Sequence, residues 1–178
     1  IDQPMSENDA LKKLKLLSKR NEIYRNFIGM GYYNTITPNV ILRNILENPG
    51  WYTSYTPYQP EVAQGRLEML LNFQQVIMDL TGMDIANASL LDEGTAAAEA
   101  VGLCQRLDKG DSKKIFVSSS CNPQTIDIIK TRVEPFGIEI IVGSEDKELN
   151  KIEDKIICGV LAYPGTLGDI KDPSEAIS

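Results

Sequence analysis

The sequence predicts an α/β fold with a parallel sheet, preceded by a largely helical amino-terminal region. Two observations support this class. From residue 86 onward, short apolar runs alternate with helix-length segments, a pattern typical of parallel strands joined by crossover helices. Before residue 86, capping residues and apolar spacing indicate helices. We therefore divide the chain into residues 1–85, a helical region with an ordered aromatic loop, and residues 86–178, the start of an α/β large domain.

The first helices are marked by their ends. Ser6-Glu7-Asn8-Asp9 has the S-x-x-D form of a capping box, and leucines and lysines continue with helical spacing from Ala10 to Arg20. Thr37-Pro38 supplies an N-cap and a first-turn proline for a second helix. That helix runs to about Glu47, and Asn48-Pro49-Gly50 ends it.

The segment from Trp51 to Pro60 is too aromatic for a mobile linker and too rich in proline for a helix. It holds Trp51, Tyr52, Tyr55 and Tyr58. We expect a packed loop, because burying each ring is worth on the order of 1.5–3 kcal/mol.

A long helix is predicted from about Val62 to Leu80, with Gly82 in the position of a C-cap glycine. Its buried stripe is expected to contain the following apolar residues: Leu67, Leu70, Leu71, Val76, Ile77 and Leu80. A glycine turn at Gly94 then opens an alanine-rich helix that ends near Leu107. The remaining elements alternate as strand 115–117, helix 123–134, strand 138–142 and strand 156–162.

Composition limits the possible functions. The 178 residues allow one domain or part of a larger one, and a net charge of −7 makes nucleic acid and anionic membranes poor partners. No apolar stretch approaches the roughly 20 residues that span a bilayer. The three cysteines are widely spaced, which favours a reducing compartment over a disulfide framework.

The sequence contains no histidine. This absence removes the commonest general base, the Ser/His and Cys/His nucleophile pairs and the usual zinc ligands. We therefore predict no metal site, and an independent small enzyme has little support.

Several long runs resemble one family, the P-proteins of the glycine cleavage system, which are glycine dehydrogenases (decarboxylating). The matching runs are Gly29–Asn34, Ile41–Trp51, Tyr55–Glu61 and Ala86–Ala100. The resemblance is to the amino-terminal half of the family. It weakens at the first residues and after about Gly143.

The resemblance implies an aspartate-aminotransferase-like fold (pyridoxal phosphate fold type I), of which this chain is a fragment. In the family, two related halves are fused or form separate subunits, and the lysine that holds pyridoxal phosphate belongs to the second half. The implied reaction is decarboxylation of glycine, followed by transfer of the aminomethyl group to lipoyl H-protein. The implied partners are therefore the second half or beta subunit, lipoyl H-protein and glycine.

In the family, the Tyr-Tyr-Asn loop of the first half faces the cofactor and glycine of its partner half. The resemblance therefore implies that Tyr32, Tyr33 and Asn34 are catalytic, with their phenol and amide groups orienting the substrate carboxylate. The alternative is that two tyrosines after Gly-Met-Gly only pack a domain junction.

A turn at a helix start has the form of a phosphate cradle, because free N–H groups and the helix dipole converge there. Gly94 and Thr95 lie in such a turn and are candidate cofactor-binding residues, as a relic of the fold. Alternatively, Asp92 or Thr95 only caps the helix. Asn122 is a third candidate, at a place where the family usually has a histidine that stacks on the cofactor. Its alternative role is as the N-cap before Pro123.

Other questions stay open at this stage. Arg43 and Glu99 lie in matching runs and Arg66 follows one, but ion pairing explains all three as well as catalysis does. The chain is alternatively a non-catalytic accessory or structural subunit of a larger assembly. A start at Ile1 suggests a trimmed chain, and Pro173-Ser174-Glu175-Ala176 suggests a further helix. The protein is expected in the cytoplasm if bacterial and in the mitochondrial matrix if eukaryotic.

Overall fold

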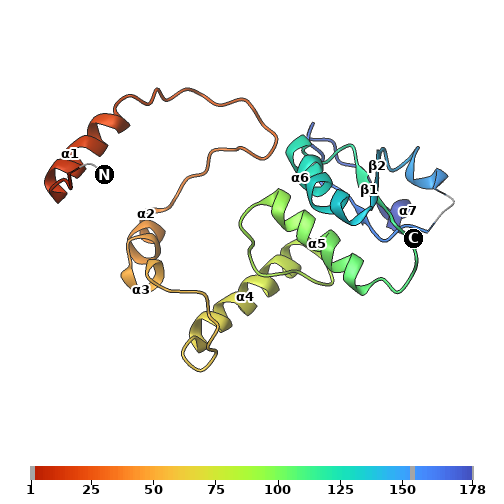
Figure 1. The fold of residues 1–178 in the computed structure, drawn as a ribbon, viewed down its shortest axis with the longest axis horizontal. Coiled ribbons are helices and arrows are strands. Elements are labelled where there is room, and N and C mark those ends of the chain that lie inside the picture. Colours follow the sequence, from red (N-terminus) through yellow and green to blue (C-terminus); the bar gives the residue numbers. More distant parts are fainter. Residues whose placement is uncertain (1–2, 153–154, 178) are drawn as a thin grey trace. The chain divides into compact units, whose positions relative to one another are not determined.

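The structure is a computed structural model that describes residues 3–152 and 155–177 (Figure 1). Contacts divide the chain into two compact units, Ile1–Asn34 and Thr35–Ser178. The domain division near residue 85 stays a prediction.

The first unit contains one helix, α1 (Glu7–Ser18), among its described residues. Ser6 caps this helix as its sequence pattern predicts, because its hydroxyl accepts the N–H of Asp9 at 3.2 Å. The Asp9 carboxylate accepts from the Ser6 hydroxyl at 2.7 Å, which differs from the backbone N–H contact of a full capping box. Glu7 and Asp9 also place negative charge in the first turn, where the helix dipole favours it. No residue of α1 is buried.

The second unit begins with short helices. The predicted helix at residues 37–47 forms as α2 (Asn39–Ile41), continues with π-type winding over Leu42–Leu46, and is followed by α3 (Pro49–Tyr52). Its N-cap is Pro38, which has no side-chain acceptor, so the prediction of a Thr37 cap is wrong. Asn48 instead caps α3, because its side chain accepts the N–H of Gly50 at 2.9 Å.

Helix α4 (Gln64–Thr81) confirms the predicted long helix, and Gly82 ends it with a left-handed φ of 70°. Only half of the residues in its predicted buried stripe are shielded from solvent to an intermediate extent, and the rest are exposed. Leu67, Leu70 and Ile77 are partly buried, but no residue of α4 is buried and Leu80 is 77% exposed. The aromatic loop differs in the same way, since Tyr55 and Tyr58 are 79% and 76% exposed. Their predicted burial is wrong because no described residue covers these surfaces.

The predicted α/β region follows (Figure 1). Its elements are α5 (Glu93–Leu107), β1 (Lys114–Ser118), α6 (Pro123–Val133), a 3-10 turn (Glu134–Phe136), β2 (Glu139–Gly143), a second 3-10 turn (Leu149–Lys151), β3 (Gly159–Val160) and α7 (Ser174–Ile177). The described strands form a parallel sheet in the order β2-β1-β3, which confirms the predicted topology. Strand β3 is shorter than the predicted 156–162.

The core lies between the central strand and the helices that pack on it. Ile115, Phe116 and Val117 of β1 are fully buried, and α5 packs against α6. The other buried apolar residues are Ala98, Val101, Cys121, Ile129, Val133 and Ile138. Pro123 occupies the first turn of α6, as predicted. In the described part of the chain, no helix combines the length and apolarity needed to cross a bilayer.

Candidate functional site

The loop that carries the tyrosine candidates is an unusual turn. Gly29, Met30 and Gly31 all have positive φ, at 67°, 54° and 88°. The N–H of Tyr32 donates to the Gly29 carbonyl at 3.0 Å and closes the turn. Left-handed backbone costs a non-glycine residue such as Met30 roughly 1–2 kcal/mol, whereas the two glycines pay no such steric cost.

This turn leaves the two phenols accessible. The side chains of Tyr32 and Tyr33 are 59% and 70% exposed, and Asn34 is exposed as well. The side-chain amide of Asn26 donates to the Tyr32 carbonyl at 3.4 Å, so the loop is held through its backbone. Within the described residues, neither phenol hydroxyl has a hydrogen-bond partner, and both are available to a group outside this loop.

A set of hydrogen-bonded polar side chains lies beyond the carboxyl end of β1. We call Glu93, Asn122, Thr125 and Thr166 the Glu93 cluster. Glu93 begins α5, and Asn122 directly precedes α6. The Asn122 amide donates to the two carboxylate oxygens of Glu93 at 3.0 and 3.2 Å, and the Thr125 hydroxyl donates at 2.8 Å. The Thr166 hydroxyl donates to Asn122 Oδ1 at 2.9 Å, which completes a closed network.

The hydrogen bonds of the cluster argue against the predicted alternative role of Asn122 as the side-chain N-cap of α6. Its side chain makes no capping bond to α6, because the amide is committed to Glu93 and Thr166. An N-cap role for its side chain is therefore wrong. Asn122 instead links the starts of two helices with the segment at Thr166.

Gly94 and Thr95 also have structural roles. Gly94 is buried, and a Cβ at this position would lie 2.3 Å from Cδ1 of Ile128, so glycine permits the close approach of α5 and α6. The N–H of Thr95 donates to the Asp92 carboxylate at 2.7 Å, which is a helix N-cap. Hydrogen bonds from the Thr95 backbone N–H and then from its hydroxyl lower the pKa of Asp92.

These contacts test whether the phosphate of pyridoxal phosphate fits here. The Asp92 carboxylate already holds the Thr95 N–H, and the Glu93 carboxylate holds Asn122 and Thr125. An anion placed at this helix start would face two carboxylates and would displace their donors. The residues therefore do not fit the phosphate, and the geometry favours structural roles for Gly94, Thr95 and Asn122.

The thiols near the sheet are poor nucleophiles. Burial, followed by the charges of Glu145 and Glu93, raises the pKa of Cys121 to about 11. Burial and the neighbouring Cys104 raise the pKa of Cys158 to about 12. Both groups are protonated at neutral pH, and thiol nucleophilicity needs the thiolate. No group of three or more histidine, cysteine or acidic residues able to hold a metal occurs in residues 3–152 and 155–177.

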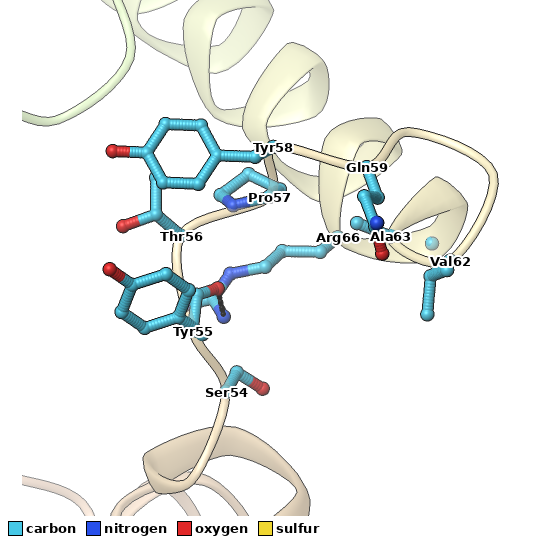
Figure 2. Close-up of a pocket in the computed structure, with 10 residues that line it drawn as sticks. Ser54, Tyr55, Thr56, Pro57, Tyr58, Gln59, Val62, Ala63 and Arg66 are labelled. Atoms are coloured by element: carbon cyan, nitrogen blue, oxygen red, sulfur yellow. Dashed lines mark hydrogen bonds between the residues drawn. The ribbon is translucent and has the colours of Figure 1, made fainter.

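Sequence patterns did not indicate a cavity of about 750 Å³ between the aromatic loop and the start of α4 (Figure 2). Its lining comprises Ser54–Gln59, Val62, Ala63, Gly65 and Arg66. The Arg66 guanidinium donates through Nη1 to the Tyr55 carbonyl at 3.1 Å, and so joins the helix to the loop. The sequence analysis singles out Arg66 alone among these lining residues, as an arginine that ion pairing explains as well as catalysis does.

The parallel sheet, its crossover helix and the helical segment before it define part of an α/β domain. The chain belongs to the family described as Glycine cleavage system P-protein, whose profile matches residues 1–178. This match confirms the family predicted from the sequence.

Two curated relatives carry the name glycine dehydrogenase (decarboxylating). That of Pelagibacter ubique (strain HTCC1062) is 75% identical over 178 residues, and that of Vibrio vulnificus (strain CMCP6) is 56% identical. Both matches cover 100% of this chain and 18% of the relative.

A solved structure, the crystal structure of glycine decarboxylase (P-protein) of the glycine cleavage system in inhibitor-bound form, is also similar. Its TM-score is 0.82 with 29% identity, over 97% of this chain and 40% of that chain. The predicted fold class is confirmed by this likeness.

Proposed function

We propose that this chain is part of a glycine dehydrogenase (decarboxylating) that removes the carboxyl group of glycine and passes the aminomethyl group to lipoyl H-protein. The observation that carries the proposal is 75% identity to the Pelagibacter ubique enzyme along all 178 residues. Because the chain spans 18% of that relative's length, the proposal concerns a larger protein of which these residues form one part.

In this proposal, pyridoxal phosphate is held by a lysine of the second half or beta subunit and acts there as an electron sink. The contacts of Asp92 and of the Glu93 cluster support this division, because the two carboxylates occupy the donors that a phosphate would need. The relatives are bacterial, which supports a cytoplasmic location.

The first unit supplies the substrate-facing groups in this proposal. The hydroxyls of Tyr32 and Tyr33 and the amide N–H groups of Asn34 donate to the carboxylate oxygens of glycine held by the partner half. Support comes from the exposure of both phenols and from a turn whose three left-handed residues fix the backbone just before them. Charge-assisted hydrogen bonds of this kind orient a carboxylate strongly.

The test replaces Tyr32 or Tyr33 by Phe in the full-length protein and measures glycine decarboxylation in the presence of lipoyl H-protein. Losing a hydrogen bond to a charged group costs roughly 1.5–3 kcal/mol, so we expect a rate about one to two orders of magnitude lower. The matched control is Tyr24→Phe, another exposed tyrosine of the same unit, which should retain the rate. Unchanged rates in both Tyr32→Phe and Tyr33→Phe would leave packing as the role of this loop.

The accessory-subunit alternative makes a different prediction. A folded full-length protein that releases no carbon dioxide from glycine with lipoyl H-protein and pyridoxal phosphate present would favour it over the enzyme. Such a result would not depend on the tyrosine variants, so the two questions are separable.

A further inference from the structure

We infer that the cavity between the aromatic loop and the start of α4 binds a carboxylate or phosphate group. Its lining includes no residue of the tyrosine loop or of the Glu93 cluster, and the inference goes beyond the proposed function. Three features of the cavity support the inference. They are its one basic side chain, the helix start that borders it, and a lining that contains no aspartate or glutamate.

The basic side chain is Arg66. Figure 2 shows it extending from α4 along the cavity to the backbone of Tyr55, while the rings of Tyr55 and Tyr58 extend away from it. Its guanidinium has five N–H donors, and within the described residues only the bond from Nη1 to the Tyr55 carbonyl, at 3.1 Å, engages it. That bond fixes the position of the guanidinium and leaves the other donors for a ligand. The planar donor fork matches the oxygens of a carboxylate or phosphate.

The helix start adds a second set of donors. The first N–H groups of a helix have no partner within the helix, and Ala63, the N-cap of α4, offers no side-chain acceptor. In the described part of the chain, no other acceptor meets the N–H groups of Gln64, Gly65 and Arg66. Ala63, Gly65 and Arg66 line the cavity, so the start of α4 and the guanidinium both border it.

The electrostatics of the cavity contrast with the rest of the chain. The net charge is −7, and α1 and α5 carry acidic residues in their first turns. The first turn of α4 has none, and no aspartate or glutamate lines the cavity. The positive end of an 18-residue helix and a guanidinium therefore face the same space without a described counter-charge.

The cavity also limits the ligand. Its volume of about 750 Å³ lies within the range of small-molecule sites. Pro57 and Val62 add apolar atoms to its lining. The chemistry therefore fits a small molecule with one anionic group attached to an apolar part. A carboxylate and a phosphate use the same donors, and the experiment separates them.

The experiment measures how fast phenylglyoxal modifies Arg66 in the full-length protein, by peptide mass spectrometry, with inorganic phosphate or acetate added at constant ionic strength. Arg43, an exposed arginine on the preceding helical segment, is the internal control. We expect one or both anions to slow modification of Arg66 and to leave Arg43 unchanged. Protection by phosphate alone assigns a phosphate site, and protection by acetate alone assigns a carboxylate site. No protection, or equal protection of Arg43, would overturn the inference.

Two variants, each with a control, test the position of the site. Binding of phosphate or acetate is measured by calorimetry. Arg66→Gln should weaken binding about tenfold to a hundredfold, while Arg43→Gln should not. Ala63→Asp places a carboxylate beside the free N–H groups and should abolish binding without unfolding the helix, because aspartate is a good residue at a helix start. Ala63→Ser is the uncharged control and should retain it. Undiminished binding in Ala63→Asp, with circular dichroism unchanged, would contradict the role of the helix start.

Discussion

The sheet region and the α4 region of the second unit contain similar apolar patterns but bury them to very different extents. Helices α5 and α6 and strand β1 each contribute buried residues to one core. The longer helix α4 contributes none, and the aromatic loop before it exposes Tyr55 and Tyr58. Amphipathic spacing shows which face of a helix is made for burial, but the covering element must also be present. The sheet region thus buries residues of several elements in one core, whereas no described element covers the apolar face of α4.

The largest expected effect comes from the centre of the sheet region. Phe116 lies in the central strand and has 0% exposure, so Phe116→Ala should lower the free energy of unfolding by about 3–5 kcal/mol. The measurement is urea unfolding of the 178-residue chain, followed by circular dichroism.

The matched change in the other region is Leu80→Ala on α4, where Leu80 is 77% exposed. We expect a change of about 0.5 kcal/mol or less, because no described contact is lost. Comparable losses in the two variants would break the comparison between the regions.

A smaller effect is expected at the Glu93 cluster. Glu93→Ala removes the acceptor of the Thr125 hydroxyl and the Asn122 amide, and should cost about 1–3 kcal/mol of unfolding free energy. Glu99→Ala on the same helix removes only a partly exposed ion pair with Arg132 and should cost about 0–1 kcal/mol. If the two costs are equal, the cluster contributes no more than a surface ion pair does.

A further effect, confined to alkaline pH, concerns the buried thiol of Cys121. The pKa of Cys121 rises from 9.0 to about 11 on folding, so the unfolded chain loses this proton first. The stabilisation from the protonated thiol is complete below the unfolded pKa and is lost as pH rises from there through about 11. Melting temperatures of the wild type and Cys121→Ala should therefore converge as pH rises through this window. A constant difference between them would show that the thiol does not couple folding to pH.

The sheet region could be predicted from sequence because its signals are local. Pro123 at the start of α6 and the apolar runs of β1 and β2 each identify an element, and a helix between the two strands favours their parallel pairing. Strand β3 is shorter than its apolar run because pairing with β1, and not hydrophobicity, sets its length.

The interactions of the candidate sites could not be predicted in the same way. Asn122 before Pro123 has the local pattern of an N-cap, but its amide bonds Glu93, which is 29 residues earlier in the chain. The cavity at Arg66 depends on a contact with Tyr55, 11 residues away, within a loop that has no periodicity. The positive φ of Met30 could not be predicted either. Gly29 and Gly31 are sufficient to explain a turn, so the sequence gives no reason to expect a left-handed residue between them.

The measurement that tests the account most directly is amide hydrogen exchange, compared between the 178-residue chain and the full-length protein that carries it. Amides of β1 and α6 should be protected in both, because their core is complete within these residues. Amides of α4 should be protected strongly only in the full-length protein. Equal protection of α4 and β1 in the 178-residue chain would contradict the account, and so would the absence of protection in β1.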